Sequence, residues 1–393
     1  MAKSRIRILH VIQSLGFGGM ESRIVRLAKG LDRESFALEV LSLRPESTGA
    51  LPLPPGTPHR FFPIPPGLHP IKLARLAALI RKGRYDIVHT HNWASMFYGI
   101  LAASLARGPL IVHGEHGLNR SDLGGIPWKR LAAQRMLIPL ADWIVPVNGV
   151  IASQVKDRWR LDGSRITIIP NGVDLARFRA PETAAVLAEA TVPEAGGLPK
   201  EGPEEFVIGM VGRLDEVKDI GCALEALRLL QERGQADGLR LVLLGGGPMA
   251  AALARQAGQL GVSERVEFAG SQPEVESWYR RFHLFMNTSV YEGMSNTLLE
   301  AMACGLPVVA SRVPGNAAWL VEGRDVRFFE PGDAEALATR IQDFREDPAA
   351  RLEMGMRNRA RMEAEFDNRH FLAAYAGLYR KLLGLPQAVS GRP

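Results

Sequence analysis

The sequence predicts an α/β protein made of two doubly wound, Rossmann-like domains that face one another across a central cleft. Its 393 residues exceed what a single hydrophobic core usually supports. Short apolar runs alternate with segments of helical period along the chain, a pattern typical of βαβ units and parallel sheets. One stretch, 181–204, interrupts this alternation and is rich in Ala, Pro, Glu and Gly, which indicates a linker.

The first domain is expected over residues 1–180, where the apolar runs predict a parallel sheet. Strands are expected at 5–13, 37–43, 85–90, 110–113, 143–147 and 165–169, and helices at 21–31 and 71–82. Ligands of doubly wound sheets bind beyond the carboxyl ends of the strands, so the residues that follow each strand are the candidates for function.

The second domain is expected over residues 205–366 and repeats this pattern. Its strands are expected at 206–211, 239–244, 266–269, 284–286 and 307–310, and its helices at 333–344 and 348–364. A last helix is expected at 370–383, inside the terminal segment 367–393, because apolar residues recur there at helical spacing.

The composition is that of a globular protein, with 46% hydrophobic and 23% charged residues, and it excludes several other classes. There is no run of 18 apolar residues to predict a transmembrane helix, and the N-terminus lacks the apolar region of a signal peptide. Cys222 and Cys304 are far apart, which excludes a disulfide framework and a cysteine zinc site. We therefore expect a cytoplasmic protein.

The charge is unevenly divided along the chain. Residues 1–180 hold 25 Lys and Arg against 12 Asp and Glu, or +13, whereas the remainder holds 23 against 30, or −7. A basic half indicates an anionic partner, either nucleic acid or a membrane surface, although an unevenly charged solvated surface gives the same count. The basic segments 71–84 and 128–135 could face an anionic membrane, in peripheral association with the inner face of the plasma membrane, and apolar residues there that simply belong to the core are the alternative. No nucleic acid is expected.

The loop after the first strand is rich in glycine and leads into a helix. Gly18 and Gly19 precede the helix, where backbone N–H groups and the helix dipole attract phosphate. Glycine also lets a ligand approach the backbone closely. The loop lacks the G-x-G-x-x-G pattern, so a nicotinamide cofactor is disfavoured. A tight turn without a ligand is the alternative.

Two cations follow the first strand of the second domain. Arg213 and Lys218 lie in a loop that begins at Gly212 and leads to a helix. A guanidinium binds phosphate through paired hydrogen bonds, and an ammonium acts as a point charge. Together they could neutralise a diphosphate leaving group without a metal. Two solvated surface cations are the alternative.

Two glutamates, Glu292 and Glu300, are separated by seven residues across a loop and a helix start. A mostly helical spacer puts their carboxylates about 10–12 Å apart, farther than the acid/base pair of a glycosidase at about 5–9.5 Å. This spacing suits the two ends of a nucleotide sugar. Glu300 needs a partner if it is buried, and ordinary solvated glutamates are the alternative. The residues expected to offer N–H groups at the helix N-terminus are Gly293, Met294, Ser295 and Asn296.

A group of titratable residues lies at two neighbouring strand ends: His89, His91, His113, Glu115 and His116. Metal sites use such residues, but the spacings are loose and the ligand set is incomplete, so we expect no metal. A histidine at a strand end can bind a hydroxyl or shuttle a proton. A satisfied structural histidine is the alternative, and it is weakest for His116.

Taken together in their order along the chain, the sequence motifs resemble those of the retaining family 4 glycosyltransferases of the GT-B fold. The resemblance is nearest to bacterial transferases of exopolysaccharide and lipid-linked glycan assembly. The resemblance covers nearly the whole chain. It rests on GGME (18–21), DIVHTH (86–91), HGEHG (113–117), PNGVD (170–174), GRLDEVK (212–218), LGGGP (244–248) and the segment that ends in EAMACGLPVV (300–309).

The resemblance implies roles for the residues that match these motifs. Arg213 and Lys218 would bind the diphosphate as it leaves, Glu292 would contact sugar hydroxyls, and His116 would contact the sugar near the reacting centre. The implied catalytic residues are His116, Arg213, Lys218 and Glu292. The implied donor-binding residues are Gly18, Gly19, Gly212, Gly293, Met294, Ser295, Asn296 and Glu300, the last of these at the ribose. His89, His91, His113 and Glu115 are weaker acceptor or cleft candidates.

The resemblance also implies substrates and a return of the last helix to the first domain. The donor would be a UDP- or GDP-sugar, the acceptor a glycan or a polyprenyl-linked lipid, and no metal or other cofactor would be required. One departure is the segment 321–329, which is shortened and lacks the Thr-Gly of the usual acidic turn. Two other functions stay open: a non-catalytic assembly subunit, and a nucleotide-sugar epimerase or a phosphorylase.

Overall fold

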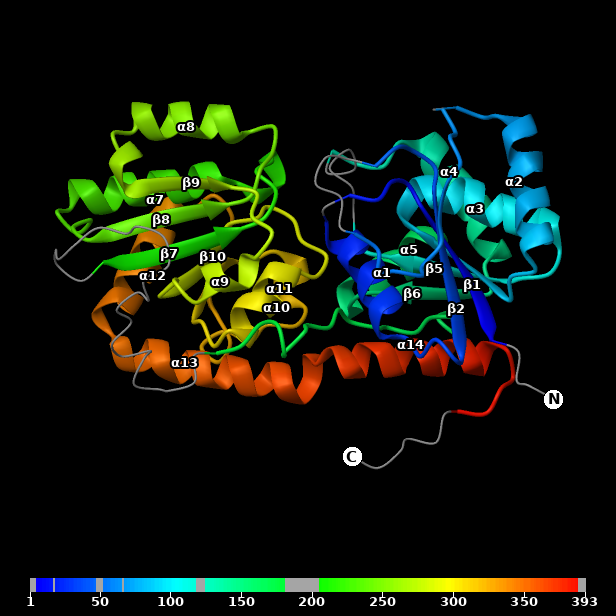
Figure 1. Ribbon diagram of the computed structural model, residues 1–393. Helices are drawn as coiled ribbons and strands as arrows, with labels where there is room; N and C mark the ends of the chain where they lie inside the picture. Colours follow the sequence, from blue (N-terminus) through cyan, green and yellow to red (C-terminus); the bar gives the residue numbers. More distant parts are fainter. Residues whose placement is uncertain are drawn as a thin grey trace. The chain divides into compact units, whose positions relative to one another are not determined.

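The structure is a computed structural model that describes residues 5–16, 18–46, 52–65, 67–117, 124–180 and 205–387. It divides into two compact units (Figure 1), one of Met1–Asn171 with Asn368–Pro393 and the other of Gly172–Asp367. The linker expected at 181–204 lies outside the described residues. The central cleft stays a prediction, because it depends on how the two units are placed.

The first unit contains a six-stranded parallel sheet. Its strands, in spatial order, are β3 (His59–Phe61), β2 (Phe36–Ser42), β1 (Ile6–Ile12), β4 (Ile87–His91), β5 (Leu110–Glu115) and β6 (Trp143–Pro146). This is the doubly wound order, and the chain direction across the sheet reverses between β1 and β4. Ligands of such sheets bind at this reversal, beyond the carboxyl ends of the strands.

Helices cover both faces of this sheet. They are α1 (Gly19–Gly30), α2 (Pro70–Gly83), α3 (Asn92–Ala106), α4 (Trp128–Leu137), α5 (Gly149–Trp159) and, from the end of the chain, α14 (Asn368–Leu382). Figure 1 shows α14, in red, beside α1. Phe371 and Tyr375 of α14 pack into the same core as Ile8 of β1. The expected return of the last helix to the first domain is therefore confirmed.

The second unit contains a second six-stranded parallel sheet with the same winding. Its strands, in spatial order, are β12 (Arg327–Phe329), β11 (Val308–Ser311), β10 (Leu284–Asn287), β7 (Phe206–Val211), β8 (Leu239–Leu244) and β9 (Val266–Gly270). The reversal lies between β7 and β10. The predicted fold class of two doubly wound α/β sheets is confirmed.

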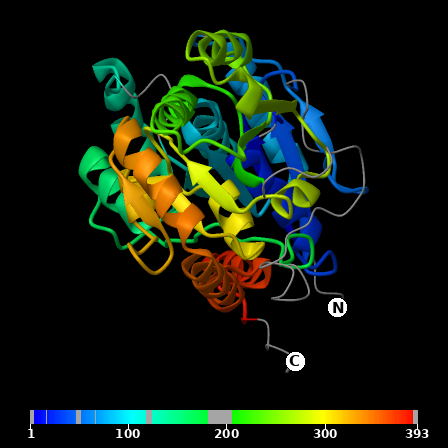
Figure 2. The ribbon, with the colours of Figure 1, turned by 90° about the vertical axis from the view of Figure 1, so that its left-hand side faces the viewer.

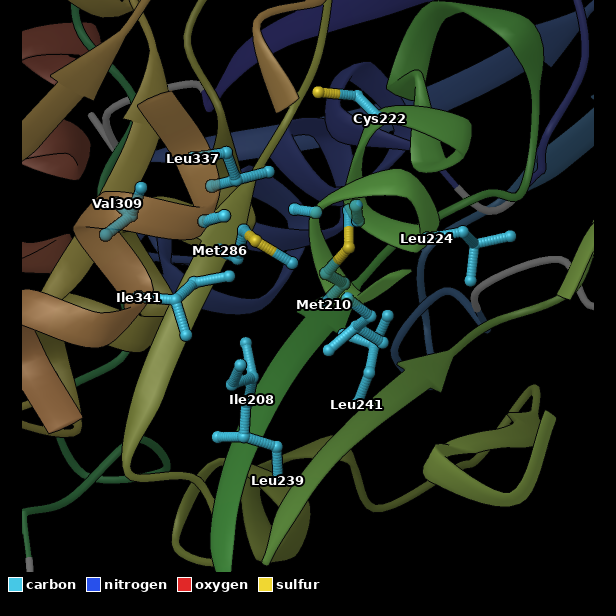
Figure 3. Close-up of a cluster of buried hydrophobic side chains, with 14 of the residues drawn as sticks. Ile208, Met210, Cys222, Leu224, Leu239, Leu241, Met286, Val309, Leu337 and Ile341 are labelled. Atoms are coloured by element: carbon cyan, nitrogen blue, oxygen red, sulfur yellow. The ribbon is translucent and has the colours of Figure 1, made fainter. Parts of the chain in front are cut away.

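The core of the second unit lies between its sheet and two long helices. Its helices are α7 (Ile220–Glu232), α8 (Ala250–Gln259), α9 (Val275–Tyr279), α10 (Asn296–Ala303), α11 (Pro314–Ala317), α12 (Ala334–Glu346) and α13 (Pro348–Arg361). Figure 2 faces this unit and shows α7, in green, beside α12, in orange. Figure 3 shows Ile208 and Leu241 of the sheet in one cluster with Ile341 of α12. This packing fixes the ends of β7 and β10.

One expected strand differs from the structure, and two observed strands were not expected. The segment expected as a strand at 165–169 forms one isolated bridge, from Ile166 to Ile144, and it lies along the edge strand β6 through hydrogen bonds such as that from the Thr167 N–H to the Ile144 carbonyl at 3.1 Å. The three-residue strands β3 and β12 were not expected; they are too short to show a period in the sequence.

The boundary between the units also differs from residue 180. Residues 172–180 belong with the second unit, because the Val173 N–H donates to the Phe366 carbonyl at 2.8 Å and Arg359 donates to the Phe178 carbonyl at 2.8 Å. Hydrogen bonds with the backbone and with a side chain of the second unit thus hold this segment.

Candidate active site

The loop that follows β7 is locked against a neighbouring glycine loop. The Gly212 N–H donates to the Leu244 carbonyl at 2.9 Å, and the Leu214 N–H donates to the Gly246 carbonyl at 3.0 Å. A Cβ at Gly245 would lie 1.9 Å from the Gly212 carbonyl oxygen, and Gly245 has φ +139°. Only glycine fits there, so the LGGGP motif fixes the path of the GRLDEVK loop.

This loop delivers Lys218 to Glu292. Lys218 ends a single 3-10 turn, η3 (Glu216–Lys218), and its Nζ lies 2.6 Å from Glu292 Oε1. The same oxygen accepts hydrogen bonds from Ser289 Oγ at 2.8 Å and Asn287 Nδ2 at 3.2 Å. Two predicted site residues from distant parts of the sequence therefore meet at the reversal between β7 and β10.

Glu292 is held as a buried carboxylate. Its side chain is 11% exposed, and this burial acts to raise its pKa, but the Lys218 charge and the hydrogen bonds from Lys218, Ser289 and Asn287 outweigh the burial. The pKa of Glu292 therefore lies below its ordinary value. The geometry favours an anion that binds hydroxyl groups over a proton donor.

Arg213 is not drawn into this contact. Its side chain is 66% exposed, and its Nε lies 3.9 Å from Asp215 Oδ2, a weak contact. The structure thus brings together Lys218 and Glu292 but leaves the Arg213 guanidinium at the surface, after Gly212 at the end of β7.

Glu300 has the partner that its position requires. It lies on α10, whose other residues Leu298, Leu299, Met302 and Ala303 are buried. The Tyr279 hydroxyl donates to Glu300 Oε2 at 2.8 Å. Burial and the neighbouring Glu300 charge hold the pKa of Tyr279 well above its ordinary value, so this hydroxyl keeps its proton. Glu300 itself is half-buried, and it has a hydrogen-bonding partner of the kind expected for a buried carboxylate.

The segment between the two glutamates leads into α10. Gly293, Met294 and Ser295 are buried, and Asn296 is the first helical residue. A Cβ at Gly315 would lie 1.9 Å from the Glu292 carbonyl oxygen, so the start of α11 packs directly on this turn. The predicted donor-binding residues therefore lie at the N-terminus of a helix, as the sequence predicts.

The glycine loop of the first unit also precedes a helix. Gly18 is the residue before α1, and its carbonyl accepts a hydrogen bond from Ser22 Oγ at 2.8 Å. Glu21 Oε2 lies 2.5 Å from where a Cβ of Gly18 would be. The Glu21 carboxylate thus folds over Gly18, in front of Gly19 at the helix start.

The reversal point of the first sheet holds a row of buried histidines. His10 of β1 pairs in register with His89 of β4, and His91 lies two residues further on the same face. His10 Nδ1 and His91 Nε2 are 2.9 Å apart, and His91 Nδ1 and His116 Nε2 are also 2.9 Å apart. The first three are at most 1% exposed, whereas His116 is half-buried.

These histidines are neutral. Burial lowers the pKa of His10 to about 3 and holds the pKa values of His89, His91 and His116 well below the ordinary range. The charges that lower these three values further belong to other histidines and to Arg23. His10 is the residue that connects the row to β1.

The other two weaker candidates lie on the other side of the sheet. His113 Nδ1 is 2.8 Å from Thr90 Oγ1, and Glu115 lies 3.6 Å from Arg158 of α5. His113 is fully buried and Glu115 is 5% exposed. The structure therefore separates His113 and Glu115 from the row formed by His91 and His116.

Among the described residues, one group of three could hold a metal by distance alone. One nitrogen from each of His10, His89 and His91 lies within 4.8 Å of the others. The expectation of a metal-independent protein stays a prediction.

Two sets of residues near the sites were missed by sequence reasoning. His10 interrupts the apolar run of β1, and a polar residue on the inner face of a buried strand was the available signal. Arg23 on α1 is fully buried and donates to the Tyr375 hydroxyl and to Asn171. Asn287 and Ser289 directly follow the apolar part of β10, and polar residues at a strand end are again the signal.

Comparisons with known proteins identify the family of both halves. A family model described as Glycosyltransferase Family 4 matches residues 17–177, and one described as Glycosyl transferases group 1 matches residues 205–347. The curated D-inositol 3-phosphate glycosyltransferase 2 of Catenulispora acidiphila is 31% identical to this chain over 84% of each.

Solved structures share the fold over nearly the whole chain. HepE of Anabaena in complex with UDP and glucose has a TM-score of 0.79 at 19% identity, and the match covers 97% of this chain and 100% of HepE. Sucrose-phosphate synthase of Thermosynechococcus elongatus has a TM-score of 0.78 at 22% identity, with 96% and 99% covered. With the fold thus confirmed as GT-B, the identity to a curated transferase over most of its length places the chain in glycosyltransferase family 4, as a transferase enzyme.

Proposed function

We propose that this protein transfers a sugar from a UDP- or GDP-sugar to a glycan or polyprenyl-lipid-linked acceptor, with retention of the anomeric configuration, in extracellular or cell-surface polysaccharide biosynthesis. The observation that carries the proposal is the contact between Lys218 and Glu292 at the reversal point of the second sheet. A cation for a leaving diphosphate and an anion for sugar hydroxyls lie side by side there.

Lys218 and Arg213 would bind the diphosphate. Preorganised cations stabilise negative charge as it develops on a leaving group, and Lys218 is already fixed by Glu292. Arg213 is 66% exposed and its 3.9 Å contact with Asp215 is weak, so its guanidinium could turn to the phosphates as they bind. The N–H groups of Gly293, Ser295 and Asn296 at the start of α10 would add to this positive end. No metal is needed in this scheme.

The two glutamates would bind the two sugars of the donor. Glu292 Oε1 already accepts three hydrogen bonds, so Oε2 is the oxygen available to hydroxyls of the transferred sugar. Tyr279 holds the Glu300 carboxylate through Oε2, and this carboxylate would accept hydrogen bonds from the ribose hydroxyls. His116 would contact the transferred sugar, and Gly18 and Gly19 would approach the donor phosphate or the acceptor.

Retention would follow from transfer on one face of the sugar without a covalent enzyme intermediate. Glu292 is engaged by Lys218 and two further donors, which suits hydroxyl binding better than nucleophilic attack. NMR analysis of the product's anomeric configuration tests this part, and an inverted product would refute it.

The first unit would bind the acceptor at an anionic membrane surface. On α4 the side chains of Trp128 and Met136 are 75% and 77% exposed, and next to Lys72 on α2 Ile71 is 72% exposed. Exposed apolar residues next to basic ones suit a lipid headgroup region. Among the described residues, no helix combines the length and the apolar composition of a membrane-spanning segment. The relatives' name makes inositol phosphate the competing acceptor.

A transfer assay tests the proposal. UDP- and GDP-sugars are supplied with a polyprenyl-phosphate-linked glycan or with inositol phosphate, and products are identified by mass spectrometry. We expect one donor to react, and we expect Lys218→Ala and Glu292→Gln to abolish the transfer. The control Arg240→Ala should transfer sugar at the native rate, because its guanidinium pairs with Glu205 at the opposite end of the sheet. Donor conversion without acceptor would indicate an epimerase, and no reaction in any combination would favour a non-catalytic homologue.

A further inference from the structure

Three imidazoles form a continuous hydrogen-bonded chain from the core of the first unit to His116. Both links are 2.9 Å long, from His10 Nδ1 to His91 Nε2 and from His91 Nδ1 to His116 Nε2. The ring planes differ by only 10° and 21° along the chain, which suits hydrogen bonds in the plane of each ring. The backbone N–H of His116 also donates to Asn92 Oδ1 at 3.2 Å. This contact fixes the position of His116 at the end of the hydrogen-bonded chain.

The chain allows only two arrangements of its protons. A neutral imidazole carries one N–H and one lone pair, so the middle ring, His91, must donate on one side and accept on the other. Both links therefore point the same way. In the outward arrangement His10 donates to His91 and His91 donates to His116 Nε2, which leaves the proton of His116 on Nδ1. In the inward arrangement the proton of His116 is on Nε2.

The buried end of the chain decides between them. His10 Nε2 is fully buried and has no hydrogen-bond partner among the described residues. The inward arrangement would place an N–H on this atom, and unpaired buried N–H groups are rare in proteins. The outward arrangement leaves a lone pair there instead. Because His10 Nε2 has no partner among the described residues, the chain also has no acceptor at its buried end to which it could pass a proton.

We propose that His10 and His91 are positioning residues that fix His116 as its Nδ1–H tautomer, a hydrogen-bond donor to the sugar that is transferred. The inference rests on the proposed function for the sugar contact of His116. Family membership and sequence motifs do not reveal which nitrogen of His116 carries the proton; the chain through His10 does.

Gly114 protects the link between His91 and His116. It pairs in register with His91 on the neighbouring strand. A Cβ at Gly114 would lie 3.0 Å from both nitrogens of that link and 3.2 Å from His89 Nε2. A methyl group at this position would therefore force the two rings to shift by a few tenths of an ångström, so an alanine there strains the link while every histidine remains.

A metal ion among the same histidines fits less well. It would have to displace a 2.9 Å hydrogen bond of His91 at either of its nitrogens. It would also add a charge where the fixed cation Arg23 already acts on His89 and His116. Metal analysis of the purified protein after dialysis against a chelator separates the two, and retained stoichiometric metal would overturn the tautomer proposal.

Two variants of His10 separate positioning from packing. Asparagine places an amide N–H where His10 Nδ1 is, so it keeps a hydrogen-bond donor to His91. Leucine fills the same space in the core but has no hydrogen-bond donor. We expect His10→Leu and Gly114→Ala to lower kcat for sugar transfer about tenfold, the effect of one lost hydrogen bond in the transition state, with unchanged affinity for the nucleoside diphosphate. His10→Asn should keep most of the rate although it is the less stable variant. A rate order that follows thermal stability would overturn the proposal.

A spectroscopic test does not depend on the reaction. ¹⁵N NMR of protein labelled at histidine distinguishes protonated from unprotonated ring nitrogens, and the His116→Gln variant assigns the signals. We expect a protonated Nδ1 on His116 in the native protein and a mixture of the two His116 tautomers in His10→Leu. A protonated Nε2 in the native chain would refute the proposal, whereas the expected tautomer in a protein that transfers no sugar would fault only the proposed function.

Discussion

Replacing Lys218 with methionine removes the cation that holds the Glu292 carboxylate. Methionine keeps most of the side-chain volume but deletes the ammonium 2.6 Å from Oε1, and that oxygen keeps only Ser289 and Asn287 as donors. Breaking a buried ion pair in this way costs about 3–5 kcal/mol. Because Lys218 is 26% exposed and Glu292 is 11% exposed, solvent screens part of this, and we expect a loss of about 2–3 kcal/mol.

The loss should depend on pH. The folded pKa of Glu292 is lowered by Lys218 against the effect of burial, so between the folded and unfolded pKa values the unfolded chain binds more protons. The stability from this pair is therefore present above the ordinary glutamate pKa of about 4.3. It is lost as the pH falls through the folded pKa. The difference in the free energy of unfolding between Lys218→Met and the native protein should therefore shrink as the pH falls.

Urea unfolding at pH 7 and in acid measures both effects. The matched control is the double variant Lys218→Met with Glu292→Gln, in which no buried charge is left unpaired and most of the lost stability should return. A single variant within about 0.5 kcal/mol of the native protein at pH 7, the size of an ordinary surface change, would refute the account of the site. So would a loss that is equal at both pH values.

Three further outcomes follow from the structure. Tyr279→Phe removes the hydroxyl that holds Glu300 Oε2 and should weaken nucleotide binding about three- to tenfold, measured by calorimetry; unchanged affinity would separate Glu300 from the ribose. Gly245→Ala should destabilise the second unit by more than about 2 kcal/mol in urea unfolding, because its Cβ would lie 1.9 Å from the Gly212 carbonyl, and a neutral effect would contradict the loop geometry. Trp128→Ala should reduce sedimentation with anionic vesicles at low salt but leave neutral vesicles unaffected, and equal sedimentation would end the membrane proposal.

Much of the fold could be predicted because its signals are local. Apolar runs bounded by turns gave β7 and β8 with their observed ends, and helical period gave α12 and α14 to within a few residues. The spatial order of the strands lies outside such signals, since it depends on pairing between distant segments. The short strands β3 and β12 owe their existence to the neighbouring strand rather than to their own sequence.

The site was predictable in its residue types but only partly in its contacts. The motifs identified Lys218, Glu292 and Glu300, and the need of a buried carboxylate for a partner anticipated a contact such as that from Tyr279. The contact between Lys218 and Glu292 spans 74 positions, and sequence spacing cannot show that the two loops meet. His10 was missed for the same reason, because its role depends on register with β4.

We expect the second unit to bind the nucleoside diphosphate of the donor, and thermal unfolding with UDP, GDP and ADP tests this binding most directly. Binding to the native state alone adds about 2.7 kcal/mol of stability at a ligand concentration of 100 times Kd. We predict a raised Tm with one of these nucleotides, kept in Arg240→Ala and lost in Arg213→Ala and Glu300→Ala. A Tm that no nucleotide changes, or a rise that survives in both site variants, would contradict the account.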